Sequence, residues 1–225
     1  MSPIRKLKHA LIVSCQAYPG EPMRHPETMA QMAEAVVAGG AAAVRAQGLD
    51  DIALIKSRIR VPLIDLWKDG HADVFITPTL EHARAVGGAG ADIVALDGTR
   101  RPRPDGRSLA RTIRELKQEA PTLVMADCGS VADAAAARDA GADIIGTTLA
   151  GYTGERPRTA GPDLALVTCI VDEMPDVPVV AEGRVHKPAQ ARQALDAGAH
   201  AVVVGTAITH PTTLTQLVPG RHPKP

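Results

Sequence analysis

The segment Ala140-Gly141-Ala142-Asp143-Ile144-Ile145-Gly146-Thr147 decides the fold, because its first four residues recur along the chain. The related phrases are Ala38-Gly39-Gly40-Ala41, Ala89-Gly90-Ala91-Asp92 and Ala197-Gly198-Ala199-His200, at spacings of 51, 51 and 57 residues. Each phrase ends a polar, alanine-rich segment and precedes a short apolar run. Glycine suits a helix end that turns through a left-handed backbone, and the apolar run is typical of a strand buried on both faces.

A second set of apolar runs interleaves with the first and completes a pattern of eight strands. The runs after the repeated phrases cover residues 42–46, 93–96, 144–147 and 201–204, and the others cover 10–13, 61–66, 121–126 and 177–181. Eight units in 225 residues leave about 28 residues for each strand, helix and pair of short loops.

Helix signals lie between these strands. Pro26 begins a segment that runs to Ala38, Thr79 and Ser130 stand at N-cap positions, and Pro188 suits a first turn. Alternating strands and helices predict a parallel sheet, and eight units predict one α/β domain over residues 1–225, a (β/α)₈ TIM barrel of the phosphate-binding type. The alternative is an open doubly wound sheet, but its usual glycine-rich turn after the first strand is missing.

The last unit is short. Only residues 211–218 follow the eighth strand before the proline-rich stretch 219–225. We therefore expect a truncated last helix and a disordered tail over 219–225. A helix this short covers its strand poorly, and a second copy of the chain would complete the cover, so we expect a homodimer.

Composition excludes several classes of partner. The 25 basic residues balance 25 acidic ones, which argues against a nucleic-acid-binding protein. Four aromatic residues form no base-stacking platform, and no apolar run approaches the roughly 18 residues of a membrane span. The apolar run at 10–13 is too short for a signal peptide. Three widely spaced cysteines fit a cytoplasmic protein without a disulfide framework.

Polar residues follow the apolar runs, and in such a barrel the carboxyl ends of the strands carry the chemistry. In chain order they are Ser14, Gln16, Arg45, Lys68, Asp97, Asp127, Thr147, Thr148, Glu182, Arg184, Gly205 and Thr206. Acids, a lysine and two arginines at one end of a barrel are side chains suited to binding an anionic substrate and catalysing its reaction.

Several of these residues have two interpretations. Lys68 is either a surface lysine or, with a lowered pKa, a general base or Schiff-base former. Glu182 ends an apolar strand, where an unpaired carboxylate is costly, which favours a functional role. Arg45 binds an anionic or carbonyl group, or forms a structural ion pair with Asp97 or Asp127. We expect Asp97 to order the arginine-rich loop that follows it.

The end of the chain predicts an anion site. Residues 181–184 read Ala-Glu-Gly-Arg and residues 204–208 read Val-Gly-Thr-Ala-Ile, so small residues follow the seventh and eighth strands. Loops in these positions often bind phosphate through backbone N–H groups; the alternative is that Gly205 only makes a tight turn. No pair of the eight histidines has metal-ligand spacing, so we expect no metal.

These motifs, in order, closely resemble the bacterial N-acetylmannosamine-6-phosphate 2-epimerases from about residue 7 to about residue 218. The segments that carry the resemblance are Leu11-Ile12-Val13-Ser14-Cys15-Gln16-Ala17, Val44-Arg45-Ala46-Gln47-Gly48, Val74-Phe75-Ile76-Thr77-Pro78-Thr79, Ala95-Leu96-Asp97-Gly98-Thr99-Arg100-Arg101-Pro102-Arg103-Pro104, Met125-Ala126-Asp127, Gly146-Thr147-Thr148-Leu149-Ala150-Gly151-Tyr152-Thr153 and Ala181-Glu182-Gly183-Arg184.

The resemblance implies an activity and roles for particular residues. It implies interconversion of N-acetylmannosamine 6-phosphate and N-acetylglucosamine 6-phosphate, in aminosugar and sialic acid breakdown, with no metal or organic cofactor. Lys68 would be the base at C2 and Glu182 the acid/base at the sugar oxygen. Residues that hold the sugar would be Gln16, Arg45 and Asp127, and residues whose backbone holds the phosphate would be Gly183, Arg184, Gly205 and Thr206.

Two stretches depart from the family pattern. His210 stands where the family has an arginine at the substrate end of the site, so we expect His210 to contact substrate with a weaker and pH-dependent affinity. Leu66-Trp67-Lys68-Asp69-Gly70 also differs from the family around the lysine. Two alternatives therefore stay open: a Schiff-base aldolase or lyase that uses Lys68, and a catalytically inactive sugar-phosphate sensor.

Overall fold

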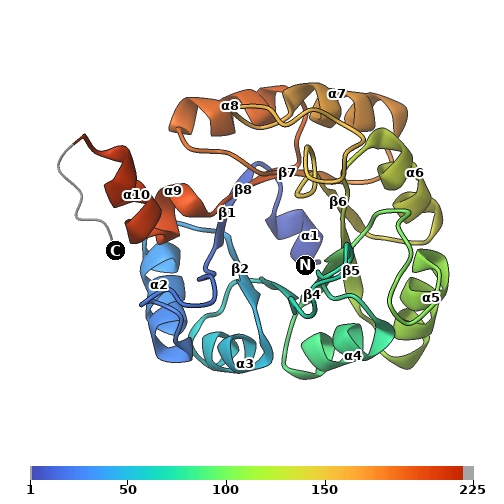
Figure 1. The fold of residues 1–225 in the computed structure, drawn as a ribbon, viewed down its shortest axis with the longest axis horizontal. Helices are drawn as coiled ribbons and strands as arrows, with labels where there is room; N and C mark the ends of the chain where they lie inside the picture. Colours follow the sequence, from blue (N-terminus) through green and yellow to red (C-terminus); the bar gives the residue numbers. More distant parts are fainter. Residues whose placement is uncertain (1, 220–225) are drawn as a thin grey trace.

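Eight parallel strands close into a barrel surrounded by helices, as a computed structural model of the chain shows for residues 2–219 (Figure 1). The strands are β1 (Ala10–Ser14), β2 (Ala43–Gln47), β3 (Leu63–Leu66), β4 (Ile93–Asp97), β5 (Leu123–Asp127), β6 (Ile144–Gly146), β7 (Val179–Glu182) and β8 (Ala201–Val204). Each strand pairs with the next, and β8 returns to β1 with Ala201 opposite Ala10. The predicted (β/α)₈ barrel is confirmed, and the open sheet is excluded.

Four helices begin where local signals predict. The helices are α1 (Pro3–Lys6), α2 (Pro26–Ala38), α3 (Leu49–Arg58), α4 (Leu80–Gly88), α5 (Leu109–Glu119), α6 (Val131–Asp139), α7 (Leu164–Glu173), α8 (Pro188–Asp196), α9 (Thr206–Thr209) and α10 (Pro211–Leu217). Those that begin as predicted are α2, α4, α6 and α8. The side chains of Thr79 and Ser130 accept backbone N–H groups at the starts of α4 and α6. The repeated phrases turn through glycines of positive φ, namely Gly40, Gly90, Gly141 and Gly198.

The strand boundaries differ from the prediction by one or two residues. β3, β5 and β7 each begin two residues later than expected, just after Pro62 and Pro178 in two cases, because proline has no N–H to give to a ladder. At the other end β4, β5 and β7 run one residue further than predicted. Asp97, Asp127 and Glu182 are therefore the last residues of their strands.

The alternation of side chains along the strands builds the floor of the site. Residues such as Ile12, Ala43, Met125 and Val180 belong to the apolar core inside the barrel. Successive side chains of a strand point to opposite faces, so the residues two positions further on also point inward. Those residues are Ser14, Arg45, Asp127 and Glu182, with Lys68 two positions beyond the inward Leu66. A polar layer thus lies directly above the apolar one.

Two four-residue helices were not predicted. In α1, Ile4 packs against the inner core together with the buried Leu7, so the N-terminal segment closes the bottom of the barrel (Figure 1). α9 follows β8 directly. One turn of helix is too short to leave a periodic apolar pattern.

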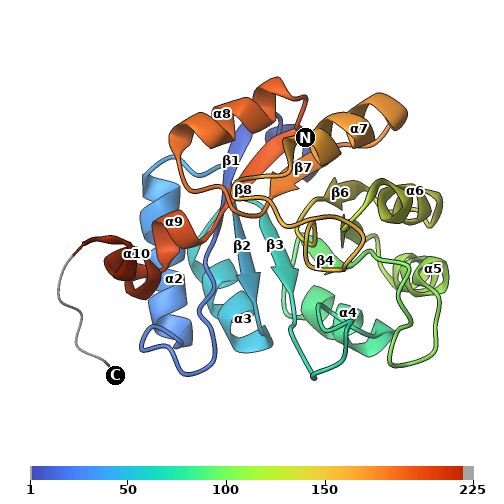
Figure 2. The same ribbon diagram turned by 45° about the horizontal axis from the view of Figure 1, so that its top comes forward.

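The last helix is short, as expected. α10 has seven residues, and Figures 1 and 2 show α9 and α10 beside α2. On the barrel wall Leu11 remains 37% exposed, and on α10 Leu217 is 70% exposed. Of the tail predicted to be disordered, residues 220–225 lie outside the described part of the chain. Across residues 2–219, no helix is long and apolar enough to cross a membrane.

A glycine at the end of β4 tests the packing between strand ends. A Cβ at Gly98 would lie 2.7 Å from Ala126 Cβ and 2.9 Å from Cys128 Sγ. We expect Gly98→Ala to lower the free energy of unfolding by about 1–3 kcal/mol, and hence the Tm by roughly 2–10 °C. Gly88→Ala is the matched control, because nothing lies within 4 Å of its Cβ; thermal unfolding in which both variants behave alike would contradict this account.

Candidate active site

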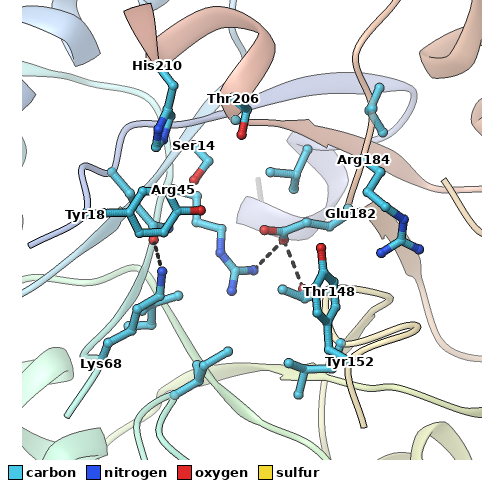
Figure 3. Close-up of a pocket in the computed structure, with 18 of the residues that line it drawn as sticks. Ser14, Tyr18, Arg45, Lys68, Thr148, Tyr152, Glu182, Arg184, Thr206 and His210 are labelled. Carbon is cyan, nitrogen blue, oxygen red and sulfur yellow. Dashed lines mark hydrogen bonds and ion pairs between the residues drawn. The ribbon is translucent and has the colours of Figure 1, made fainter. Parts of the chain in front are cut away.

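A cavity of about 570 Å³ opens at the carboxyl ends of the strands. Of the site residues predicted from the sequence, those that line it are Gln16, Arg45, Lys68, Glu182, Gly183, Arg184, Gly205, Thr206 and His210. Figure 3 shows most of these side chains around the opening. Asp127 is the exception, since it is fully buried beneath Arg45. The fold therefore gathers residues from six loops and strand ends into one place.

Arg45 is the centre of the polar layer, although only 1% of its side chain is exposed. Its Nη2 lies 2.5 Å from Asp127 Oδ2, and its Nη1 donates to Glu182 Oε2 at 2.8 Å. Burial lowers the pKa of Arg45, but Asp127 and Glu182 outweigh this effect, and the net shift is upward. The guanidinium thus stays charged. Of the two interpretations, the ion pair with Asp127 is present, and Asp97 takes no part in it.

The Thr148 hydroxyl lies between the carboxyl groups of Glu182 and Asp127. It lies 2.6 Å from Asp127 Oδ1. It also lies 3.1 Å from Glu182 Oε2 (Figure 3). One hydroxyl carries one hydrogen and can donate it to only one of these carboxyl groups. Burial raises the pKa of Glu182, opposed mainly by Arg45. A raised pKa suits a carboxyl group that holds a proton and gives it up during a reaction.

Lys68 lies just beyond the end of β3 and points into the cavity. Its Nζ donates to Gln16 Oε1 at 2.9 Å and lies 5.7 Å from the centre of the Tyr18 ring. Burial lowers the pKa of Lys68 from 10.5 to about 8, and the Arg45 cation adds to this shift. Glu182 opposes the shift, which shows that the two groups interact electrostatically. Gln16, predicted to hold the sugar, contacts the proposed base.

The loop after β7 has an unusual backbone. Gly183 has φ 109° and Arg184 has φ 58°, two consecutive left-handed residues. The Arg184 guanidinium donates to the carbonyls of Gly161 and Ala150 and to Thr159 Oγ1. Its side chain therefore anchors the long loop between β6 and α7, and because all three acceptors are uncharged, the positive charge of Arg184 remains beside the cavity that it lines. The backbone of Gly183 and Arg184 still borders the cavity.

Gly205 and Thr206 form the facing wall of the cavity. Gly205 is the N-cap of α9, and Thr206 is its first residue. N–H groups in the first turn of a helix have no acceptor within that helix. Like the loop after β7, this segment offers small residues and backbone close to the space where a ligand would bind.

His210 lies near Tyr18 at the edge of the cavity. The rings are 5.1 Å apart, and His210 Nδ1 is 3.8 Å from Glu21 Oε1 with no hydrogen-bond partner. Only 7% of His210 is exposed. The imidazole therefore has a buried nitrogen free to accept or donate a hydrogen bond beside the cavity.

Sequence reasoning assigned no role to four residues of this cavity. Thr148 contacts both carboxyl groups, Tyr18 and Tyr152 stand at the rim, and Arg101 lines the wall next to Asp97. Tyr18 and Tyr152 are half of the aromatic residues in the chain. Both lie shortly after strand-end motifs, and this position is the signal that could have identified them. The hydroxyl of Thr148 follows β6, but its partners lie on β5 and β7, which no local pattern reveals.

Asp97 has the loop-ordering role expected of it. It is fully buried and accepts hydrogen bonds from the backbone and the hydroxyl of Thr99, at 2.9 and 2.6 Å. Arg101 donates to its other oxygen at 2.8 Å.

In the part of the chain that the structure describes, no group of three or more histidine, cysteine or acidic side chains could hold a metal ion.

The family model described as "Putative N-acetylmannosamine-6-phosphate epimerase" matches residues 29–219. A relative from Cutibacterium acnes, named "Putative N-acetylmannosamine-6-phosphate 2-epimerase", is 64% identical over 94% of this chain and 93% of its own length. A relative of the same name from Caldanaerobacter subterraneus is 45% identical over 96% of this chain and 92% of its own.

A solved structure agrees with these sequence matches. The N-acetylmannosamine-6-phosphate 2-epimerase from Clostridium perfringens superposes with a TM-score of 0.91 at 36% identity, covering 95% of this chain and 93% of the other. The chain therefore belongs to the N-acetylmannosamine-6-phosphate epimerase family.

Proposed function

We propose that this protein is an isomerase that interconverts N-acetylmannosamine 6-phosphate and N-acetylglucosamine 6-phosphate at C2. The observation that carries the proposal is the pairing of Lys68, an amine with a pKa of about 8, and Glu182, a carboxyl group with a raised pKa, in one buried cavity. The relatives named for this activity support it. The substrate is accordingly a small sugar phosphate.

The chemistry follows from these two groups. In the open-chain aldehyde, C2 lies beside the C1 carbonyl, so loss of its proton gives an enolate. Neutral Lys68 takes the C2 proton, the C–H electron pair forms the C1–C2 double bond, and the carbonyl electrons move to O1. Protonated Glu182 donates to that oxygen and stabilises the developing charge. The Lys68 ammonium then gives a proton to the opposite face of C2 while O1 returns its proton to Glu182 and the carbonyl re-forms, which gives the epimer and restores both groups.

The rest of the cavity serves to hold the substrate. Backbone N–H groups of Gly183, Arg184, Gly205 and Thr206 bind the phosphate, supported by the left-handed turn after β7 and the helix start after β8. His210 contacts the same end of the substrate through its unpartnered Nδ1. Gln16 and the Arg45–Asp127 pair hold the sugar, and Gln16 also keeps the Lys68 amine in place.

We also propose that the protein is a cytoplasmic homodimer. The exposed Leu11 on β1 and the exposed Leu217 on α10 support a contact with a second copy, because an isolated chain leaves these apolar side chains in water. The free thiols of Cys15, Cys128 and Cys169 support a reducing compartment.

Removal of the base tests the mechanism. We expect Lys68→Ala to reduce the exchange of the C2 proton of N-acetylglucosamine 6-phosphate for deuterium by about 10²–10⁴-fold, measured by NMR in D₂O. Lys8→Ala is the matched control, since Lys8 is exposed at the opposite end of the barrel. Absence of C2 exchange in the unaltered protein would instead favour the inactive sensor, and a borohydride-trapped adduct on Lys68 would favour the aldolase.

The pH dependence tests the protonation state of Lys68. Because the pKa of Lys68 is lowered to about 8, the neutral amine dominates above that pH and is lost below it. We expect kcat/KM, which reports the ionising groups of the free enzyme, to fall about tenfold for each pH unit below roughly 8. A midpoint near the ordinary lysine value of 10.5 would show that the base is not buried in the working enzyme.

Sedimentation tests the homodimer. We expect a mass twice the 23.5 kDa of one chain, and a shift toward single chains when Leu217 on α10 is replaced by glutamate, because a charge in a buried apolar contact is costly. Leu217→Met is the matched control. A single-chain mass for the unaltered protein at micromolar concentration would refute the proposed dimer.

A further inference from the structure

The loop that carries Lys68 lies outside the barrel sheet and needs its own support. We define the Lys68 strap as residues 67–77, the segment between the end of β3 and the approach to α4. Its two limbs are joined by an antiparallel bridge between Lys68 and Ile76, and the Thr77 N–H donates to the Trp67 carbonyl at 2.8 Å. Lys68, Phe75 and Ile76 of the strap line the cavity.

Outside the strap, His82 on α4 contacts both neighbours of Lys68. The Trp67 and His82 rings lie 4.4 Å apart, and His82 Nε2 lies 3.0 Å from Asp69 Oδ2. In extended backbone, alternate side chains lie on the same face. Trp67 and Asp69 therefore share the outer face, and Lys68 between them projects to the inner face and into the cavity.

The hydrogen bonds around His82 fix the orientation of its ring. A carboxylate only accepts, so Nε2 carries the hydrogen that reaches Asp69. On the other side of the ring, Nδ1 lies 2.6 Å from Thr79 Oγ1. The same oxygen accepts the backbone N–H of His82 at the start of α4. Both imidazole nitrogens are thus satisfied, and the ring is bound to the N-terminus of a rigid helix.

We propose that His82 is a positioning residue for the C2 epimerisation: it holds Trp67 and Asp69 against α4 so that Lys68 stays in the cavity. The inference rests on the proposed function and deepens it. It also gives a role to the Trp67-Lys68-Asp69-Gly70 stretch that departs from the family pattern, because Trp67 and Asp69 are the two residues that His82 contacts. Since Asp69 is 57% exposed, its ion pair contributes little by itself, and the fixed geometry is the important effect.

The strap also explains how Lys68 keeps its environment. Groups that face the Lys68 amine come from several elements: Gln16 and Tyr18 follow β1, Arg45 lies within β2, and Glu182 ends β7. All of these are independent of His82. A looser strap would let water reach the amine, and its pKa would rise toward the ordinary value.

His82→Ala is the decisive variant, with three readouts. We expect kcat for C2 deuterium exchange to fall about tenfold, since small misplacement of a reacting group is costly, while KM for N-acetylglucosamine 6-phosphate changes less than twofold. We expect the pH midpoint of Lys68 acetylation by acetic anhydride, followed by peptide mass spectrometry, to rise by about one unit. Fluorescence of Trp67, the only tryptophan, should report the lost ring contact.

Matched variants separate positioning from general damage. Asp69→Asn keeps an oxygen that can accept from His82 Nε2 and should retain kcat within about twofold, whereas Asp69→Ala should follow His82→Ala in weaker form. His71→Ala, an exposed histidine in the same loop, should change nothing. If His82→Ala does not fold, Asp69→Ala takes its place.

The outcomes are distinct. An unchanged kcat and an unchanged Lys68 midpoint, in a folded variant whose Trp67 emission has shifted, would overturn the inference. If the unaltered protein exchanges no deuterium at C2, the proposed function fails. The acetylation midpoint still shows whether His82 positions Lys68, because it needs no turnover.

Discussion

A buried guanidinium is the constraint on which the rest of the site depends. Removing Arg45 from water is costly unless its charge is matched within hydrogen-bond distance. Asp127 and Glu182 supply that match at 2.5 and 2.8 Å, yet Arg45 lies in the middle of β2 whereas Asp127 and Glu182 end β5 and β7, and these strands are far apart in the sequence. They meet only because the sheet closes into a barrel, so the closed fold and the charged centre require each other.

The same centre determines where protons reside. The Arg45 cation faces the carboxyl groups of Asp127 and Glu182. Lys68 is the fourth ionisable group near them. A neutral Lys68 leaves Arg45 able to balance only one carboxylate, and Asp127, with two nitrogens of the guanidinium and the Thr148 hydroxyl near it, has the more donors of the two. Glu182 is then the group that keeps a proton. The base form of Lys68 and the acid form of Glu182 therefore arise together, as deprotonation at C2 requires.

The sequence predicted most of the fold because its signals are local. Glycines with positive φ end helices after the repeated phrase, prolines precede strands, and Thr79 and Ser130 cap helices by contacts within a few residues. Strand-end positions likewise predicted Lys68 and Glu182. The partners were not predictable: Thr148 bridging two other strands, Arg184 fastening a loop and His82 reaching Asp69 depend on the packing of distant segments.

The groups that we propose to act on the substrate differ in how firmly the fold holds them. Arg45, Asp127 and Glu182 belong to strands, where ladder hydrogen bonds and neighbouring side chains fix the backbone. Lys68 lies two residues past the end of β3, so the ladder that orients the others does not reach it. A reaction that transfers a proton between Lys68 and C2 needs both at hydrogen-bond distance. Lys68 is instead held by the strap, through its bridge to Ile76 and its contact with His82. These contacts fix the position of Lys68 as the barrel strands fix the positions of the other residues.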